Sequence, residues 1–265
     1  MASSATGGKS SGKHHVRGGV CAPCNMSRRQ IPEEVATAIK KSWPDGVVEP
    51  FDTDESYFHD VRPRFERDLR KIRGTSLLWQ TEVESSVSGS WDEEALPSSE
   101  EFQSYHVYFL APDDSEFQFE DETEALNKPE DSVEESGDAT CPGEGWIGCA
   151  AGICLVARYA VINLTSFSRY EDGTRSTPDV ESFIFSDTTG ARVDTEQYYR
   201  ETLSQEAFQK LETLRGAIAS VLWKHHIKVL DTAILDLPVP KLKASPDVFL
   251  EEPLRVRDAF FFRGV

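Results

Sequence analysis

The segment WIGCAAGICLVARYAVINL, residues 146–164, is almost entirely apolar, and it decides the fold class. Its length would suit a membrane-spanning helix, but Arg158 would cost about 2.5–3.5 kcal/mol near the centre of a bilayer. Acidic sequence also precedes the segment. Buried β-strands explain the run better, so we expect two or three strands over residues 146–170 and no membrane association.

The sequence outside this run contains further strand signals. Residues 102–110, FQSYHVYFL, are full of aromatic and β-branched side chains. A turn signature at residues 111–114 leads into residues 116–120, so we expect a hairpin with Phe117 and Phe119 on one face. Other extended segments are expected at residues 75–87, 181–186 and 227–230.

Helical patterns predict two main amphipathic helices and a short N-terminal helix. The short helix opens at Pro32. The second helix has Asp60 as its expected N-cap and Pro63 in its first turn. The longest helix begins at Ser204 and runs to about His226, and a shorter helix is expected after Asp194.

Strands in runs, rather than in strict alternation with helices, favour an α+β fold with a mostly antiparallel sheet. We expect a single domain over residues 33–265, with a mobile acidic loop at about residues 121–144. The apolar segment AFFF at residues 259–262 is expected to dock on the core.

The first 32 residues contain five basic residues, no acidic residue, and many Ser and Gly. We expect a flexible basic tail over residues 1–32, and organelle targeting by this tail is the alternative. The chain has five scattered Cys and no apolar secretory signal, which is typical of reduced thiols in a cytoplasmic or nuclear protein.

Negative charge is concentrated in one part of the chain. Residues 82–144 contain 20 acidic residues and one basic residue, whereas the whole chain has a formal net charge of −18. The rest of the chain is therefore close to neutral. Concentrated charge attracts basic partners or cations and repels nucleic acid. Residues 60–73 carry six basic residues just before this window, and we expect partial pairing between the two within the fold.

The first functional hypothesis is a non-enzymatic interaction or regulatory protein with an acidic, aromatic-containing surface. Such a surface would bind a basic protein partner, because aromatic side chains anchor a contact that charge only steers. Direct binding of nucleic acid is disfavoured. The expected partner-binding residues are Asp113, Asp114, Glu116, Phe117, Phe119, Glu120, Asp121 and Glu122.

The alternative hypothesis is an enzyme whose site is assembled from distant residues. The candidate catalytic residues are His59, Asp60, His106 and His225, because imidazole and carboxylate groups serve as general acids and bases. The chain contains no Gly-x-Ser-x-Gly, His-Glu-x-x-His or Gly-x-Gly-x-x-Gly motif. These absences favour the interaction hypothesis over the enzyme hypothesis.

A third hypothesis is a zinc-stabilised protein. Cys21 and Cys24 are spaced to hold one side of a tetrahedral site, with His14 and His15 as further ligands. Adjacent histidines make a poor second pair because neighbouring side chains diverge. We therefore expect no cofactor, with a structural zinc site as the weaker alternative.

Overall fold

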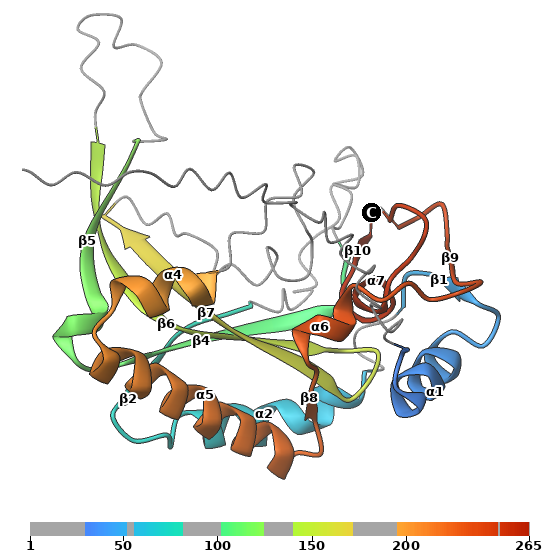
Figure 1. The fold of residues 1–265 in the computed structure, drawn as a ribbon, viewed down its shortest axis with the longest axis horizontal. Helices are drawn as coiled ribbons and strands as arrows, with labels where there is room; N and C mark the ends of the chain where they lie inside the picture. Colours follow the sequence, from blue (N-terminus) through green and yellow to red (C-terminus); the bar gives the residue numbers. More distant parts are fainter. Residues whose placement is uncertain are drawn as a thin grey trace, which may run out of the picture.

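The computed structural model describes residues 30–51, 56–81, 102–124, 140–171, 195–248 and 250–264. Its helices pack against a curled, mostly antiparallel sheet, which confirms the α+β prediction (Figure 1). The helices are α1 (Glu33–Ser42), α2 (Tyr57–Leu69), α4 (Thr195–Thr202), α5 (Gln205–Lys224), α6 (Thr232–Leu235) and α7 (Val256–Phe260), with a 3₁₀ turn, η2 (Ser115–Phe117). The strands are β1 (Val47–Val48), β2 (Thr75–Gln80), β3 (Phe102–Gln103), β4 (Tyr105–Pro112), β5 (Gln118–Glu124), β6 (Thr140–Cys154), β7 (Tyr159–Tyr170), β8 (Lys228–Val229), β9 (Lys243–Ala244) and β10 (Arg263–Gly264).

The main sheet has the strand order β2-β4-β6-β7-β8. Its neighbours are antiparallel except for β8, which runs parallel to β7. The apolar segment at residues 146–164 divides between β6 and β7, as predicted, and pairs with itself along most of its length. Within the described residues, none of the helices has both the length and the apolar character needed to span a bilayer.

The predicted hairpin between residues 102–110 and 116–120 is wrong. Both β4 and β5 pair with β6: β4 lies against residues 149–154, and β5 lies against residues 140–146. They therefore follow each other along one side of the same long strand, with η2 between them. β4 and β6 approach each other closely where the first pairing ends. Gly148 permits this approach, because a Cβ at this position would lie 2.1 Å from the Leu110 carbonyl oxygen.

Side-chain alternation along the strands produces two cores, one on each face of the sheet. In β4, Tyr105 and Phe109 belong to the core that contains α1, α7 and the C-terminal segment. Tyr108 and Leu110 point to the opposite face and pack with α2, α4 and α5. Figure 1 shows α2 and α5 together along the sheet, while α1 and α7 gather at the end far from β5.

Local signals set most helix boundaries. The Ser204 hydroxyl caps α5 by accepting a hydrogen bond of 3.0 Å from the Ala207 amide, as expected, and the C-cap residue His225 lies next to the expected end at about His226. The predicted cap of α2 is wrong by one turn. Ser56 takes that role, accepting a hydrogen bond from the Phe58 amide, and Asp60 lies inside the first turn.

The C-terminal segment docks on the core, as predicted. Residues 259–262 are fully buried, and the indole Nε1 of Trp43, the C-cap residue of α1, donates a 2.9 Å hydrogen bond to the Ala259 carbonyl. Burying each phenylalanine ring contributes about 1.5–3 kcal/mol. The end of the chain therefore helps to close the first core.

The predicted acidic loop at about residues 121–144 has strand structure at both ends. Residues 118–124 of β5 pair with residues 140–146 of β6, and we call this two-stranded ribbon the acidic arm. Figure 1 shows the arm extending beyond the helices. The rest of the loop, the tail at residues 1–29 and the predicted strand at residues 181–186 lie outside the described residues.

Candidate functional site

A groove of about 910 Å³ lies between α5, the turn from α2 to β2, and the end of β4. We call it the α5 groove. Helical periodicity places residues from successive turns of α5 along one side of it. Ile72, Pro112, Leu214 and Ala217 provide its apolar lining. Its polar lining consists of Arg73, Thr75, Asp114, Gln205, Glu206, Gln209, Lys210 and Thr213, with Gly74 at the turn.

Acidic residues of the predicted partner-binding set lie at one end of this groove. Lys210 of α5 donates from its Nζ to Asp114 Oδ2 at 2.8 Å and also to a carboxylate oxygen of Glu116. The same ammonium lies 6.0 Å from the centroid of the Phe117 ring. Hydrogen bonds to the two carboxylates raise the pKa of Lys210 above its ordinary value.

The two phenylalanines of the predicted set differ in their burial. Phe117 ends η2 and is fully buried, whereas the side chain of Phe119 on β5 is 37% exposed. The Phe119 ring covers Gly145 of the neighbouring strand, where an added Cβ would lie 2.2 Å from ring carbons. A partner can therefore reach the ring of Phe119, but it cannot reach Phe117 without a rearrangement of η2.

The acidic arm holds the other predicted residues. Glu120 and Glu144 are exposed and stand directly opposite each other in the β5–β6 register. Asp121 accepts a hydrogen bond of 2.9 Å from the hydroxyl of Tyr170. The backbone of Glu122 pairs with Pro142. Asp113, at the other end of the set, is exposed and accepts a hydrogen bond of 2.7 Å from the Ser76 hydroxyl.

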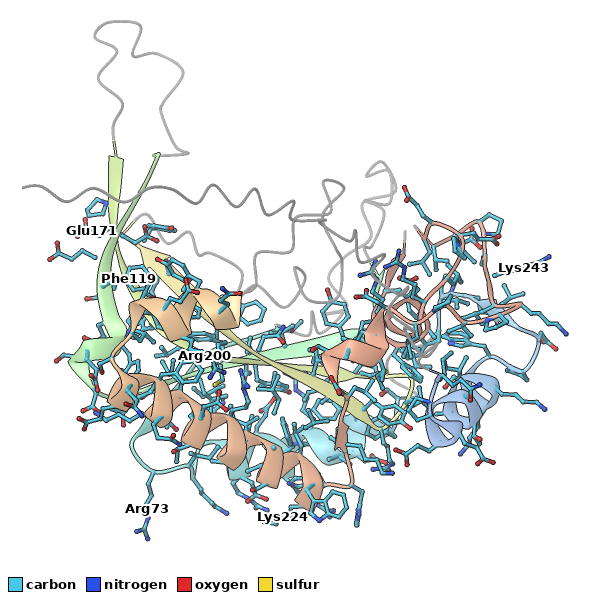
Figure 2. The ribbon with its side chains drawn as sticks, viewed as in Figure 1. Arg73, Phe119, Glu171, Arg200, Lys224 and Lys243 are labelled. Carbon is cyan, nitrogen blue, oxygen red and sulfur yellow. The ribbon has the colours of Figure 1, made fainter. Side chains whose placement is uncertain are left out.

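Figure 2 locates several of the labelled side chains relative to the arm and to α5. Phe119 and Glu171 lie at the arm, whereas Arg73 points outward from the α2–β2 turn and Lys224 lies at the far end of α5. Among the described residues, Arg62 of α2 pairs with Glu66 of the same helix. Asp68 of α2 pairs with Lys71, just after the helix, and with Lys224 of α5. The expected pairing of α2 with the acidic window stays a prediction for the acids outside the described residues.

The candidate catalytic residues are not gathered at one place. His59 and Asp60 are exposed on the first turn of α2. His106 packs against Phe58, with ring centroids 5.8 Å apart, and His225 packs against Phe65 at 5.7 Å. The two histidines thus contact different rings of α2.

The environment of His106 does not suit a general base at neutral pH. Burial, followed by the charge of Arg62, lowers its pKa to about 4. Its Nδ1 is buried and has no hydrogen-bond partner in the described part of the chain. His225 Nε2 lies 3.1 Å from Asp68 Oδ2, so it belongs to the contact between α2 and α5.

The described residues contain no group of three or more His, Cys, Asp or Glu side chains placed to hold a metal ion. Cys149 and Cys154 are buried core thiols, and burial raises the pKa of each to about 12. Such thiols are inert as nucleophiles at neutral pH. The predicted zinc ligands Cys21 and Cys24 lie outside the described residues.

Sequence reasoning missed the residues that α5 contributes to the groove. Lys210 lies 96 positions from Asp114, and no local pattern links the two. The apolar stripe of the helix was visible, but its polar positions looked like an ordinary solvated face.

Comparison of the chain with protein-family models, curated proteins and solved structures found no match. The geometry and charge of the α5 groove and the acidic arm are therefore the basis for proposing a function.

Proposed function

We propose that this chain is a non-enzymatic interaction protein that binds a basic segment of a protein partner in the α5 groove. The observation that carries the proposal is the combination of an apolar lining with carboxylates at the rim. Asp114 and Glu206 line the groove itself, and Glu116 and Asp113 lie beside it. A bound segment would place apolar side chains on the half-buried Ile72 and Ala217 and cations at the rim.

The size and openness of the groove suit a short peptide segment. Its volume of about 910 Å³ lies near the upper end of the range for small-molecule pockets, about 300–1,000 Å³. Apolar contacts would supply the affinity, because exposed ion pairs contribute only about 0–1 kcal/mol. The rim charges would provide orientation and selectivity for basic over acidic segments.

The acidic arm would extend the negative field beyond the groove. Glu120 and Glu144 are exposed on the ribbon that continues from η2. Their field would raise the association rate of a basic partner, and this contribution falls as salt screens the charges. The enzyme hypothesis has less support, because its candidate residues occupy separate environments.

Binding of a labelled peptide of alternating Lys and Leu, measured by fluorescence anisotropy, tests the proposal. The matched probe is a peptide of alternating Glu and Leu. We expect the Lys peptide to bind more tightly by tenfold or more, and its affinity to fall between low and high salt. Equal binding of the two peptides would contradict the proposal.

A charge-matched pair of variants locates the site. The double variant D114N/E206Q removes two rim carboxylates, and E49Q/E251Q removes two exposed carboxylates near the β1–β9 end of the chain. We expect the first to weaken binding of the Lys peptide about tenfold and the second to change it less than twofold. Equal losses would mean that net charge, and not the groove, determines binding.

A further inference from the structure

The inference that follows rests on the proposed function. It concerns Lys210, whose ammonium already contacts the carboxylates of Asp114 and Glu116. We propose that Lys210 is an internal competitor in the α5 groove and that a lysine of the partner replaces it. The partner segment would then carry a lysine beside apolar residues. Because Lys210 already occupies these carboxylates, a cation that binds them more weakly would not displace it. Lys210 would in this way set the affinity of the site.

The cation position is formed by one element and filled by another. Asp114 and Glu116 both come from the turn after β4, where Phe117 is buried and its amide donates to the Asp114 carbonyl at 3.1 Å. The ammonium comes from α5, more than 90 positions away in the chain. The backbone that carries the two carboxylates is therefore held in place independently of Lys210.

The chemistry of the position favours a compact ammonium over a guanidinium. Oxygens of two different carboxylates converge on one nitrogen, with the face of an aromatic ring 6.0 Å away. A lysine ammonium is a point charge that several acceptors can share, and aromatic rings attract it. An arginine fork is matched best by the two oxygens of a single carboxylate.

Displacement of Lys210 would cost little. The side chains of Lys210, Asp114 and Glu116 are 39%, 59% and 39% exposed, respectively. Exposed ion pairs of this kind are weak, and the four-carbon stem of lysine can move into water without disturbing the helix backbone. A partner lysine would form the same contacts and add the burial of its apolar neighbours.

The geometry of the groove also defines the partner segment. The side chain of Lys210 lines the groove together with the half-buried Ala217, two turns further along α5, and Ile72 of the α2–β2 turn lines it as well. A lysine that enters along the groove would bring its neighbouring side chains onto these residues. The preferred segment is therefore a lysine flanked by Leu, Ile or Val.

The variant K210M, assayed with the alternating Lys–Leu peptide, tests this inference. K243M is the control: it removes the same charge from β9, and Figure 2 places Lys243 at the end of the molecule far from Phe119. We expect K210M to bind the Lys peptide three- to tenfold more tightly and K243M to stay within twofold of the unmodified chain. A matched Arg–Leu peptide should gain less from K210M.

The outcomes separate this inference from the proposed function. If K210M leaves or lowers the affinity while D114N/E206Q still weakens it, Lys210 only pins η2 to α5, and the inference fails alone. If neither variant changes binding, both proposals fail. Should K210M unfold, the ¹³Cε signal of Lys210 in the unmodified chain decides: displacement by the Lys peptide shifts it towards that of a free lysine, and an unchanged signal overturns the inference.

Discussion

Asp68 of α2 accepts a hydrogen bond of 2.7 Å from the ammonium of Lys224 of α5, at the place where the C-terminal ends of the two helices meet. Lys71 and His225 approach the same carboxylate, each at 3.1 Å. Asp68 is only 8% exposed, although both lysines extend into solvent. Hydrogen bonds from Lys224 and Lys71 hold the pKa of Asp68 below its ordinary value of 3.8.

The substitution D68N should lower the melting temperature at neutral pH, because an amide cannot pair with the surrounding cations. The pKa of Asp68 is lower in the folded chain than in the unfolded chain. Its stabilising contribution is therefore complete above the unfolded value of 3.8 and is lost as the pH falls through the folded value. Thermal unfolding from pH 3 to pH 8 should show the variant approaching the unmodified chain in acid. The exposed Asp45 provides the control, and D45N should have almost no effect.

The burial of His106 leads us to expect a separate loss of stability in mild acid. Burial lowers its pKa from 6.5 to about 4, so the unfolded chain binds a proton more readily in this interval. Stability should decrease as the pH falls from 6.5 towards 4, by at most about 3 kcal/mol for this group. The variant H106L removes the titrating ring and should show a smaller decrease in chemical denaturation at pH 7 and pH 5. Identical pH dependence in both proteins would contradict this assignment.

Phe117 and Phe119 should respond differently to truncation, although they are two residues apart. Phe117 is fully buried, so F117A should lower the free energy of unfolding by about 3–5 kcal/mol. F119A should cost clearly less, because its ring is 37% exposed and lies over Gly145. Urea titrations of the two variants provide the comparison. Similar losses would contradict the difference in burial between the two rings.

This pair illustrates where sequence patterns are sufficient and where they are not. A period of two predicts Phe117 and Phe119 on one face, but it does not predict that Phe117, at the end of η2, is fully buried while Phe119 on β5 is 37% exposed. The cap at Ser204 and the apolar stripe of α5 depend on neighbours within one or two turns, and the sequence predicts them well.

Pairings between distant segments were harder to predict. Nothing local indicates that β4 and β5 share β6 as a partner, because strand pairing depends on which surfaces bury most apolar area. The same holds for Lys210, whose partner Glu116 is 94 positions away. The predicted set therefore includes Asp114 of the groove lining, while Glu206 and the helix that completes the groove were not predicted.

The opposed carboxylates of Glu120 and Glu144 predict a conflict between stability and binding in the acidic arm. Like charges directly opposite each other destabilise an antiparallel pair, and both side chains are exposed. The variant E120K replaces this repulsion with an attraction and should stabilise the ribbon by about 0.2–1 kcal/mol, seen as slower hydrogen exchange of the β5 and β6 amides. Added salt should reduce the gain, because the charges are exposed.

The same substitution should weaken binding of the alternating Lys–Leu peptide, because it removes negative field next to the α5 groove. Most of the loss should appear in the association rate, since Glu120 does not line the groove. E120Q separates the two effects: it removes the repulsion without adding a positive charge, so it should fall between E120K and the unmodified chain in both measurements. If E120K slows exchange but leaves the association rate unchanged at low salt, the arm contributes nothing to binding. Its charges would then serve only to keep the edge of β5 from pairing with other chains.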